Sequence, residues 1–174
     1  MSGLLFIVSA PSGAGKTSLI KELLKRQSST LAVAISHTTR LPRKNEVDGK
    51  DYHFISEKEF IELTKKHAFL ETASVFSNYY GTSFKAIDTI IAETKDVLLE
   101  IDYQGAQQVI KKYNAVTTFI LPPSIQDLEQ RLHKRGKDKD TVIKERLAKS
   151  RKEISQIDLY DYALINDNFS QAVD

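Results

Sequence analysis

The sequence contains no cysteine and no apolar run long enough to span a membrane. The absence of cysteine excludes disulfides, thiolate metal sites and cysteine nucleophiles. The apolar runs Leu4 to Val8 and Leu31 to Ile35 are far shorter than the roughly 20 residues that a membrane-spanning helix needs. No basic segment opens the chain. We therefore expect a soluble, cytoplasmic protein with no membrane partner.

The sequence also lacks an excess of charge of one sign, and it lacks internal repeats and linkers. Twenty-five Lys and Arg residues against 23 Asp and Glu residues leave a formal net charge of +2, which is too balanced for wholesale binding to nucleic acid. No repeat, low-complexity tract or linker rich in Pro, Gly and Ser divides the 174 residues. One domain with insertions is the simplest interpretation.

Alternating strand and helix patterns predict an α/β fold with a parallel sheet. An apolar run of strand length, Leu4 to Ser9, is followed by a loop and by Lys16 to Arg26, in which apolar residues recur at helical spacing. The alternation returns with a strand at Val97 to Ile101, a helix at Gln104 to Tyr113 and a strand at Val116 to Leu121. Repeated βα units of this kind favour parallel strands.

Two capping patterns mark helix starts outside these units. Ser56 with Glu59, and Ser124 with Asp127, place a hydroxyl before a helix and a carboxylate three residues later. The first pattern lies in a long stretch of different character between the first two βα units, and we expect residues 32–84 to form an inserted substrate lobe. A later helix and a final strand are predicted at residues 141–157 and 162–165.

A glycine-rich segment, here called the phosphate loop (residues 10–17, APSGAGKT), joins the first strand to the first helix. It matches the phosphate-binding pattern of nucleotide-binding proteins, except that Ala10 replaces the first glycine. Gly13 and Gly15 allow backbone N–H groups to point inward, and Lys16 adds a full charge. A glycine-rich turn with a chance lysine is the alternative, and the strand and helix on either side argue against it. We expect ATP phosphates at Ser12, Gly13, Ala14, Gly15, Lys16 and Thr17, with Mg²⁺ at the Thr17 hydroxyl.

The phosphate loop alone leaves kinases, GTPases and ATPases open, and a second set of motifs separates them. The motifs are SHTTRLPR at residues 36–43, GKDY at 49–52, Glu71, NYYGTS at 78–83, EIDYQG at 100–105 and IND at 165–167. In these motifs, and over nearly the whole chain from Phe6 to Phe169, the sequence closely resembles guanylate kinases.

The resemblance implies a P-loop three-layer α/β fold with a central parallel sheet, an inserted GMP-binding lobe and a helical lid. It also implies an enzyme that uses ATP and Mg²⁺ to phosphorylate GMP, while the use of dGMP stays open. The implied core is residues 1–31, 85–130 and 153–174, the GMP-binding lobe is 32–84, and the lid region is 131–152.

The chemistry of the second set of motifs fits a guanine nucleotide. Arg40 and Arg43 are forked donors that can hold a phosphate, and the phenols of Tyr52 and Tyr80 can complete the grip. The resemblance places these four residues at the GMP phosphate. Guanine offers N1–H and the 2-amino group as adjacent donors, and the carboxylate of Glu71 can accept from both. Adenine offers neither, so the same carboxylate would be left unpaired by AMP.

Hydroxyls and two further carboxylates complete the implied site. By resemblance, Ser36 and Thr82 donate to guanine O6. Glu100 and Asp102 end a buried strand, at the edge where open α/β sheets bind ligands. The resemblance implies that Asp102 helps to position Mg²⁺ through water and that Glu100 lies near the guanosine, although a structural salt bridge is also open for Glu100. Singly, each residue fits an ordinary structural role; their combination with the phosphate loop favours a binding site.

Basic residues are concentrated between Arg131 and Lys152, where ten Lys and Arg residues outnumber three Asp and Glu residues, a net charge of +7. In the family this region is the lid that closes over ATP, and Arg135 and Arg146 match its transition-state arginines. A solvated helix face is the alternative, and it applies to most of the lysines. A nucleic-acid surface is disfavoured because aromatic residues are missing from the segment. The implied catalytic residues are Lys16, Arg43, Arg135 and Arg146, and the further ATP-binding residues are Arg131 and Asn166.

Two other functions stay open at this point. A guanylate-kinase-like domain can serve as a protein-interaction module, which the intact Gly15-Lys16-Thr17 and lid arginines argue against. An enzyme with another acceptor, such as AMP or dTMP, is the second alternative, and Glu71 with Thr82 argues against it. Family members usually continue beyond the position of Asp174, and residues 168–174 are expected to begin a helix. The oligomeric state is not indicated by the sequence.

Overall fold

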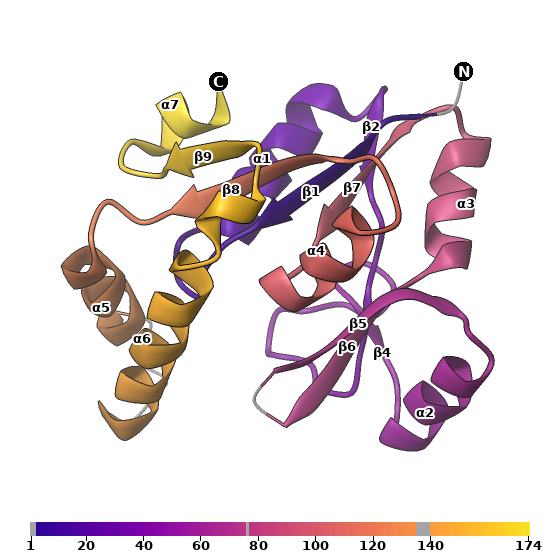
Figure 1. Cartoon of the computed structure of the whole chain (residues 1–174), viewed down its shortest axis with the longest axis horizontal. Coiled ribbons are helices and arrows are strands. Elements are labelled where there is room, and N and C mark those ends of the chain that lie inside the picture. Colours follow the sequence, from indigo (N-terminus) through magenta and orange to yellow (C-terminus); the bar gives the residue numbers. More distant parts are fainter. Residues whose placement is uncertain (1–2, 76, 135–139) are drawn as a thin grey trace.

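The computed structural model describes residues 3–75, 77–134 and 140–174 of the chain. A parallel sheet lies at its centre (Figure 1). Its strands are β1 (Leu5–Ser9), β2 (Leu31–Val33), β7 (Asp96–Glu100), β8 (Val116–Leu121) and β9 (Tyr162–Ile165). They lie in the order β2-β7-β1-β8-β9, and every neighbouring pair is parallel. The carboxyl ends of β1 and β7 therefore meet at one edge of the sheet, as the alternating pattern predicts.

Helices cover both faces of this sheet, because successive strand residues point to opposite sides. Ile7 of β1 shares a core cluster with Val109 on one face, whereas the next residue, Val8, packs with Leu19 on the other. Full burial of such an aliphatic side chain contributes about 1.5–3 kcal/mol. The helices beyond the first face are α3 (Phe84–Ala92) and α4 (Tyr103–Ile110), and those beyond the second are α1 (Lys16–Gln27) and α7 (Phe169–Val173).

A second, smaller sheet lies in the segment between β2 and α3. Its order is β4-β3-β6-β5, with a long antiparallel pairing between the last two strands. Phe60 stacks on Phe69 and on Tyr79, with ring centroids 4.7 and 5.4 Å apart. The predicted capping box is confirmed: Ser56 Oγ accepts from the Glu59 N–H, and the Glu59 carboxylate accepts from the Ser56 N–H. The elements are β3 (His37–Thr38), β4 (His53–Phe54), α2 (Glu57–Lys65), β5 (Phe69–Val75) and β6 (Asn78–Ser83).

Two helices, α5 (Ile125–Lys134) and α6 (Asp140–Ile154), pack side by side beyond the carboxyl end of β8 (Figure 1). Leu128 and Ile143 are buried in the cluster between them. The start of α5 is the predicted one, because Ser124 Oγ accepts from the Asp127 N–H at 3.0 Å. A short 3₁₀ helix, η1 (Ile157–Leu159), links α6 to β9.

Several boundaries differ by one residue from the sequence prediction, and three differ by more. Helix α4 ends at Ile110, because the N–H groups of residues 112 and 113 both turn back to the Val109 carbonyl, at 3.0 and 2.9 Å. Helix α6 ends at Ile154 and gives way to the 3₁₀ turn. Strand β2 pairs with β7, so residues 32 and 33 lie in the parallel sheet. Across the described ranges, no helix is both long and apolar enough to cross a membrane.

Candidate active site

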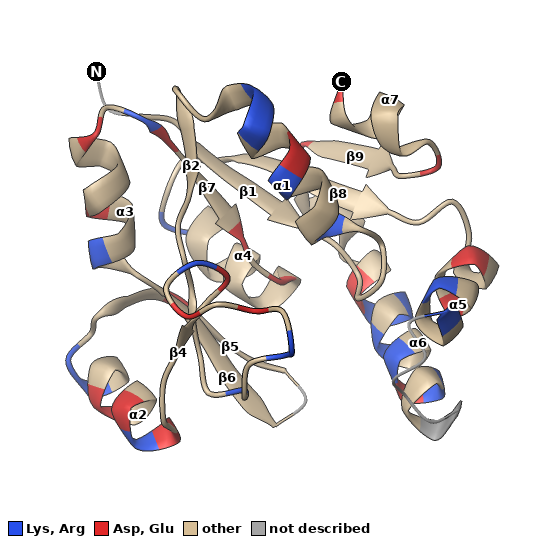
Figure 2. Ribbon diagram, turned by 180° about the vertical axis from the view of Figure 1, so that it is seen from behind, with Lys and Arg blue, Asp and Glu red and all other residues tan. Residues whose placement is uncertain are grey.

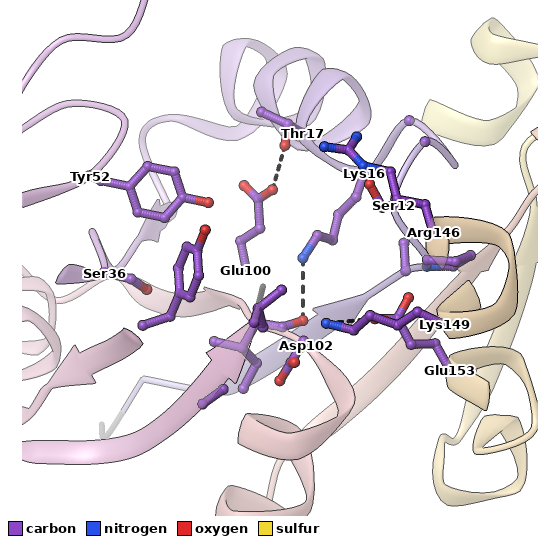
Figure 3. A pocket seen from close by; sticks show the side chains of 18 of the residues that line it. Ser12, Lys16, Thr17, Ser36, Tyr52, Glu100, Asp102, Arg146, Lys149 and Glu153 are labelled. Atoms are coloured by element: carbon purple, nitrogen blue, oxygen red, sulfur yellow. Dashed lines mark hydrogen bonds and ion pairs between the residues drawn. The ribbon is translucent and has the colours of Figure 1, made fainter. Parts of the chain in front are cut away.

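A cavity of about 260 Å³ opens at the carboxyl ends of β1 and β7, between the phosphate loop, the smaller sheet and α6 (Figure 3). It brings together most of the residues that the sequence singled out. The phosphate loop contributes Ser12, Gly13, Gly15, Lys16 and Thr17. The smaller sheet and its loops contribute Ser36, Arg43, Tyr52, Glu71 and Tyr80. The end of β7 and helix α6 contribute Glu100, Asp102 and Arg146.

The phosphate loop adopts a conformation that depends on its glycines. Gly13 and Gly15 have φ angles of 102° and 98°, in the left-handed region that side chains disfavour. A Cβ atom at Gly15 would also overlap Nδ2 of Asn166. The loop ends at the N-terminus of α1, where free N–H groups and the helix dipole favour an anion. The geometry therefore explains why glycine is needed at both positions.

Lys16 and Thr17 reach from the start of α1 to the end of β7. Lys16 Nζ donates to the Ile101 carbonyl at 3.3 Å, which holds the ammonium at the cavity (Figure 3). Thr17 Oγ1 donates to Glu100 Oε1 at 2.6 Å. Asp102 caps α4 and accepts from the N–H groups of Gln104 and Gly105.

Hydroxyl and carboxylate oxygens of Thr17, Glu100 and Asp102 are the donor types that Mg²⁺ prefers. These side chains gather at the same edge of the sheet as the phosphate loop. The residues present therefore fit a magnesium ion held partly through water.

Glu71 lies at the end of the cavity formed by the smaller sheet, and only 3% of its surface is exposed. Its Oε1 accepts hydrogen bonds from the backbone N–H and the hydroxyl of Thr82, at 2.8 and 2.7 Å. Since the Thr82 hydroxyl proton is directed at Glu71, the 2.9 Å contact between Ser36 Oγ and Thr82 Oγ1 has Ser36 as its donor. Burial raises the pKa of Glu71 to about 7, against the two hydrogen bonds from Thr82, which lower it.

Arg40 and Arg43 converge on Glu46, a residue that the sequence did not single out. Arg40 donates from both terminal nitrogens to the Glu46 carboxylate, at 2.9 and 3.0 Å. Arg43 donates to it through its backbone N–H at 2.7 Å. Arg40 Nε is buried and has no hydrogen-bond partner among the described residues. The rings of Tyr52 and Tyr80 lie beside this cluster, 6.0 Å apart. In this structure, both arginines therefore bind an oxyanion, the carboxylate of Glu46.

Helix α6 directs one face at the cavity (Figure 3). Arg146, Lys149 and Glu153 line it, at the i, i+3, i+7 spacing of a single helical face. Glu153 is only 6% exposed, and its carboxylate lies 3.8 Å from Lys149 Nζ. Burial raises the pKa of Glu153 to about 7, although Lys149 and a backbone hydrogen bond from Ser12 lower it. Figure 2 shows the Lys and Arg residues gathered along α6.

Arg131 and Asn166 lie behind the phosphate loop and do not line the cavity. Arg131 donates to the carbonyls of Ala14 and Asn166, at 3.3 and 2.9 Å. Asn166 Nδ2 donates to the Ala14 carbonyl at 2.7 Å. The two side chains thus support the loop from the side of α5 and β9. Arg135 lies outside the described residues.

Comparison with known proteins decides the family. The family model described as guanylate kinase matches residues 2–174. The chain belongs to the guanylate kinase family. A guanylate kinase from Shewanella denitrificans is 52% identical over 172 residues, which cover 98% of this chain and 83% of the relative. One from Escherichia coli K12 is 51% identical over 173 residues, which cover 98% of this chain and 84% of the relative.

A solved guanylate kinase supports the same assignment. The guanylate kinase of Anaplasma phagocytophilum, known from a crystal structure, is 31% identical in sequence to this chain, and the two structures superpose with a TM-score of 0.81. The match covers 99% of this chain and 81% of that chain. The resemblance stated from the motifs and the predicted α/β fold are both confirmed.

Three charged residues of the cavity and of the arginine cluster in this guanylate kinase chain escaped the sequence analysis. Lys149 and Glu153 follow Arg146 on the same face of α6, so helical spacing from that arginine could have found them. Glu46 had no such signal, because only the folded loop brings its carboxylate to the two arginines.

Proposed function

We propose that this guanylate kinase transfers the γ-phosphoryl group of ATP to GMP in the cytoplasm, as a step of purine nucleotide metabolism, with Mg²⁺ as its cofactor. One observation carries the proposal: a single cavity is lined by Lys16 of the phosphate loop and by Glu71 and Arg43 of the smaller sheet. A nucleotide donor and a guanine acceptor can therefore meet in it.

We assign the donor side of the cavity to ATP. The backbone of Ser12, Gly13, Ala14 and Gly15 holds its phosphates, together with Lys16 and Thr17. Arg131 and Asn166 support ATP from behind the loop. Thr17 and, through water, Asp102 hold Mg²⁺, which neutralises phosphate charge when bound.

The acceptor side is assigned to GMP. Arg40, Arg43, Tyr52 and Tyr80 hold its phosphate; Arg43, Tyr52 and Tyr80 line the cavity, and Glu46 orients the two arginines. Glu71 accepts from guanine N1–H and the 2-amino group. Ser36 and Thr82 donate to O6 once the Thr82 hydroxyl turns from Glu71, whose Oε1 the Thr82 N–H continues to hold. Glu100 lies on the guanosine side.

The GMP phosphate is ionised at neutral pH, so transfer needs alignment and charge neutralisation rather than a general base. Lys16, Arg43, Arg146 and Arg135 supply positive charge around the transferred group. Closure of the lid region (131–152) over the core (1–31, 85–130 and 153–174) and the GMP lobe (32–84) excludes water, which prevents idle ATP hydrolysis.

Chromatography of reaction products tests the proposal. The chain is incubated with ATP, Mg²⁺ and one nucleoside monophosphate at a time: GMP, dGMP, AMP, CMP, UMP or dTMP. We expect GDP and ADP in equal amounts with GMP, and only traces of product with AMP or the pyrimidines. Preferential use of another monophosphate would contradict the proposed acceptor. Loss of ATP without any phosphorylated acceptor would contradict the proposed reaction.

A further inference from the structure

Helix α4 lies directly against the side chain of Glu71. A Cβ atom built at Gly105, in the first turn of that helix, would overlap Glu71 Oε2. The same atom would come within 3.0 Å of Cδ and 3.4 Å of Cγ of Glu71. Both residues are buried. The end of the Glu71 side chain therefore occupies the space that a side chain at position 105 would need.

The glycine at this position is not required by the backbone. Gly105 lies inside α4, and the glycines with positive φ are Gly13, Gly15 and Gly49 among the residues described. Glycine is less favourable than alanine inside a helix by up to about 1 kcal/mol. Its N–H donates to Asp102, a bond that any residue other than proline could make. What glycine provides at position 105 is space.

Glu71 is consequently held from two sides. Oε1 is fixed by the N–H and hydroxyl of Thr82 on β6, as described above. Oε2 lies against Gly105 on α4. A carboxylate wedged in this way keeps one orientation, which is the condition for presenting both oxygens to two adjacent donors of a base.

Helix α4 also fixes the strand that carries Glu71. Gln108 Nε2 donates to the Thr72 carbonyl at 2.6 Å, and Gln108 Oε1 accepts from the Thr72 N–H at 3.1 Å. Strand β5 is at the edge of the smaller sheet, and these two bonds satisfy its backbone on the side away from β6, one residue after Glu71. Gln104 adds a bond to the Ser74 carbonyl at 3.2 Å. The position of Glu71 is thus set by α4 through the backbone as well as through its side chain.

We propose that Gly105 is a specificity-determining residue: its missing side chain lets Glu71 seat its carboxylate where guanine N1–H and the 2-amino group are read. The inference rests on the role proposed for Glu71. Gly105 does not line the cavity, so it acts as a positioning residue. The three atoms nearest to a Cβ at position 105 all belong to the side chain of Glu71, so a side chain there displaces Glu71 rather than backbone.

The experiment compares kcat/KM for GMP and AMP in the full chain and in Gly105→Ala, Glu71→Gln and their double variant. In Gly105→Ala, we expect kcat/KM for GMP to fall roughly 10- to 100-fold, because two polar interactions with the base are misaligned. The value for AMP should change less than about threefold, and the affinity for ATP should be kept. The melting temperature should fall somewhat, because displacing the buried carboxylate costs more than alanine contributes to the helix.

Comparison of the double variant with the single variants distinguishes a failure of the role proposed for Gly105 from a failure of the role proposed for Glu71. In the Glu71→Gln background, the further change at Gly105 should have little effect on the GMP/AMP ratio. If Glu71→Gln shifts that ratio while a well-folded Gly105→Ala leaves it unchanged, the role of Gly105 is refuted and that of Glu71 stands. If Glu71→Gln leaves the ratio unchanged, the proposed role of Glu71 is refuted, and the inference with it.

A second pair of variants keeps the test decisive if Gly105→Ala fails to fold. Glu71→Asp shortens the side chain by one methylene and withdraws the carboxylate from the space at position 105. We expect Gly105→Ala to alter kcat/KM for GMP by less than about threefold in this background. A loss of about tenfold or more on adding Gly105→Ala to Glu71→Asp would show that Gly105 does not act through Glu71.

Discussion

Glu71 and Thr82 form a buried pair in which a single carboxylate oxygen, Glu71 Oε1, accepts both the backbone N–H and the hydroxyl of Thr82. The second oxygen lies against α4. In the protein without nucleotides, burial outweighs the two hydrogen bonds and raises the pKa of Glu71 to about 7. The residue proposed to read guanine is therefore costly to ionise until guanine supplies its donors.

Glu71→Gln should stabilise the nucleotide-free protein more at pH 8 than at pH 5. The pKa of the acid rises from 4.5 when unfolded to about 7 when folded, so the folded state holds the extra proton between these values. The contribution of Glu71 to the free energy of unfolding is fully present below pH 4.5. It is lost as the pH rises from 4.5 through about 7, and the loss is on the order of a few kcal/mol. The glutamine carbonyl can still accept from Thr82. The melting temperatures of the wild type and of Glu71→Gln are measured at both pH values. The same difference between the two proteins at pH 5 and at pH 8 would contradict the prediction.

Lys16→Ala should reduce phosphoryl transfer by about 100-fold or more while leaving GMP affinity close to that of the wild type. The ammonium lies beside the phosphate loop and the Ile101 carbonyl, on the side assigned to ATP. Turnover is measured in a coupled assay, and GMP affinity by calorimetry. Unimpaired turnover would remove Lys16 from the mechanism, and a matching loss of GMP affinity would move it to the acceptor side.

Arg43→Ala should weaken GMP binding and turnover together, each by about tenfold or more, because the guanidinium holds the acceptor phosphate and also stabilises charge in transfer. Arg43→Lys should recover little of either, since a point charge cannot replace the fork. Steady-state kinetics with varied GMP separates KM from kcat. A fully active lysine variant would show that bidentate recognition is the wrong account.

Glu153→Ala should weaken ATP binding more than GMP binding. The buried carboxylate receives a backbone hydrogen bond from Ser12 of the phosphate loop and lies beside Lys149, so its removal leaves the Ser12 N–H without this acceptor and breaks the ion pair with Lys149. The expected loss of stability is about 1–3 kcal/mol. Glu145→Ala, at an exposed position of the same helix, is the matched control. Equal ATP affinity in both variants would limit Glu153 to a structural role.

Local patterns in the sequence were sufficient for elements whose stability is local. The capping box of Ser56 with Glu59 starts α2 as predicted, and β9 has the predicted bounds, residues 162–165. The phosphate loop lies between a strand and a helix, as its motif requires. Strands β3 and β4 have only two residues each and exist through pairing with partners distant in the chain, so periodicity cannot reveal them.

Tertiary contacts account for what the sequence did not predict in the site. Glu46 looks like any loop carboxylate until its loop folds onto Arg40 and Arg43. Gly105 belongs to a recognised motif, yet its steric relation to Glu71 depends on how α4 packs on β5. The roles of the predicted site residues stay predictions until variants are measured.

The ratio of kcat/KM for GMP to kcat/KM for AMP, in the wild type and in Glu71→Gln, tests the central claim most directly. The glutamine keeps one acceptor but places a donor where guanine needs a second acceptor, so GMP efficiency should fall steeply. AMP should gain little in absolute rate, and the ratio should shrink by roughly 100-fold or more, the order expected when a buried polar pairing is lost. An unchanged ratio in protein with a normal thermal melt would contradict the account, because Glu71 would then not read the base.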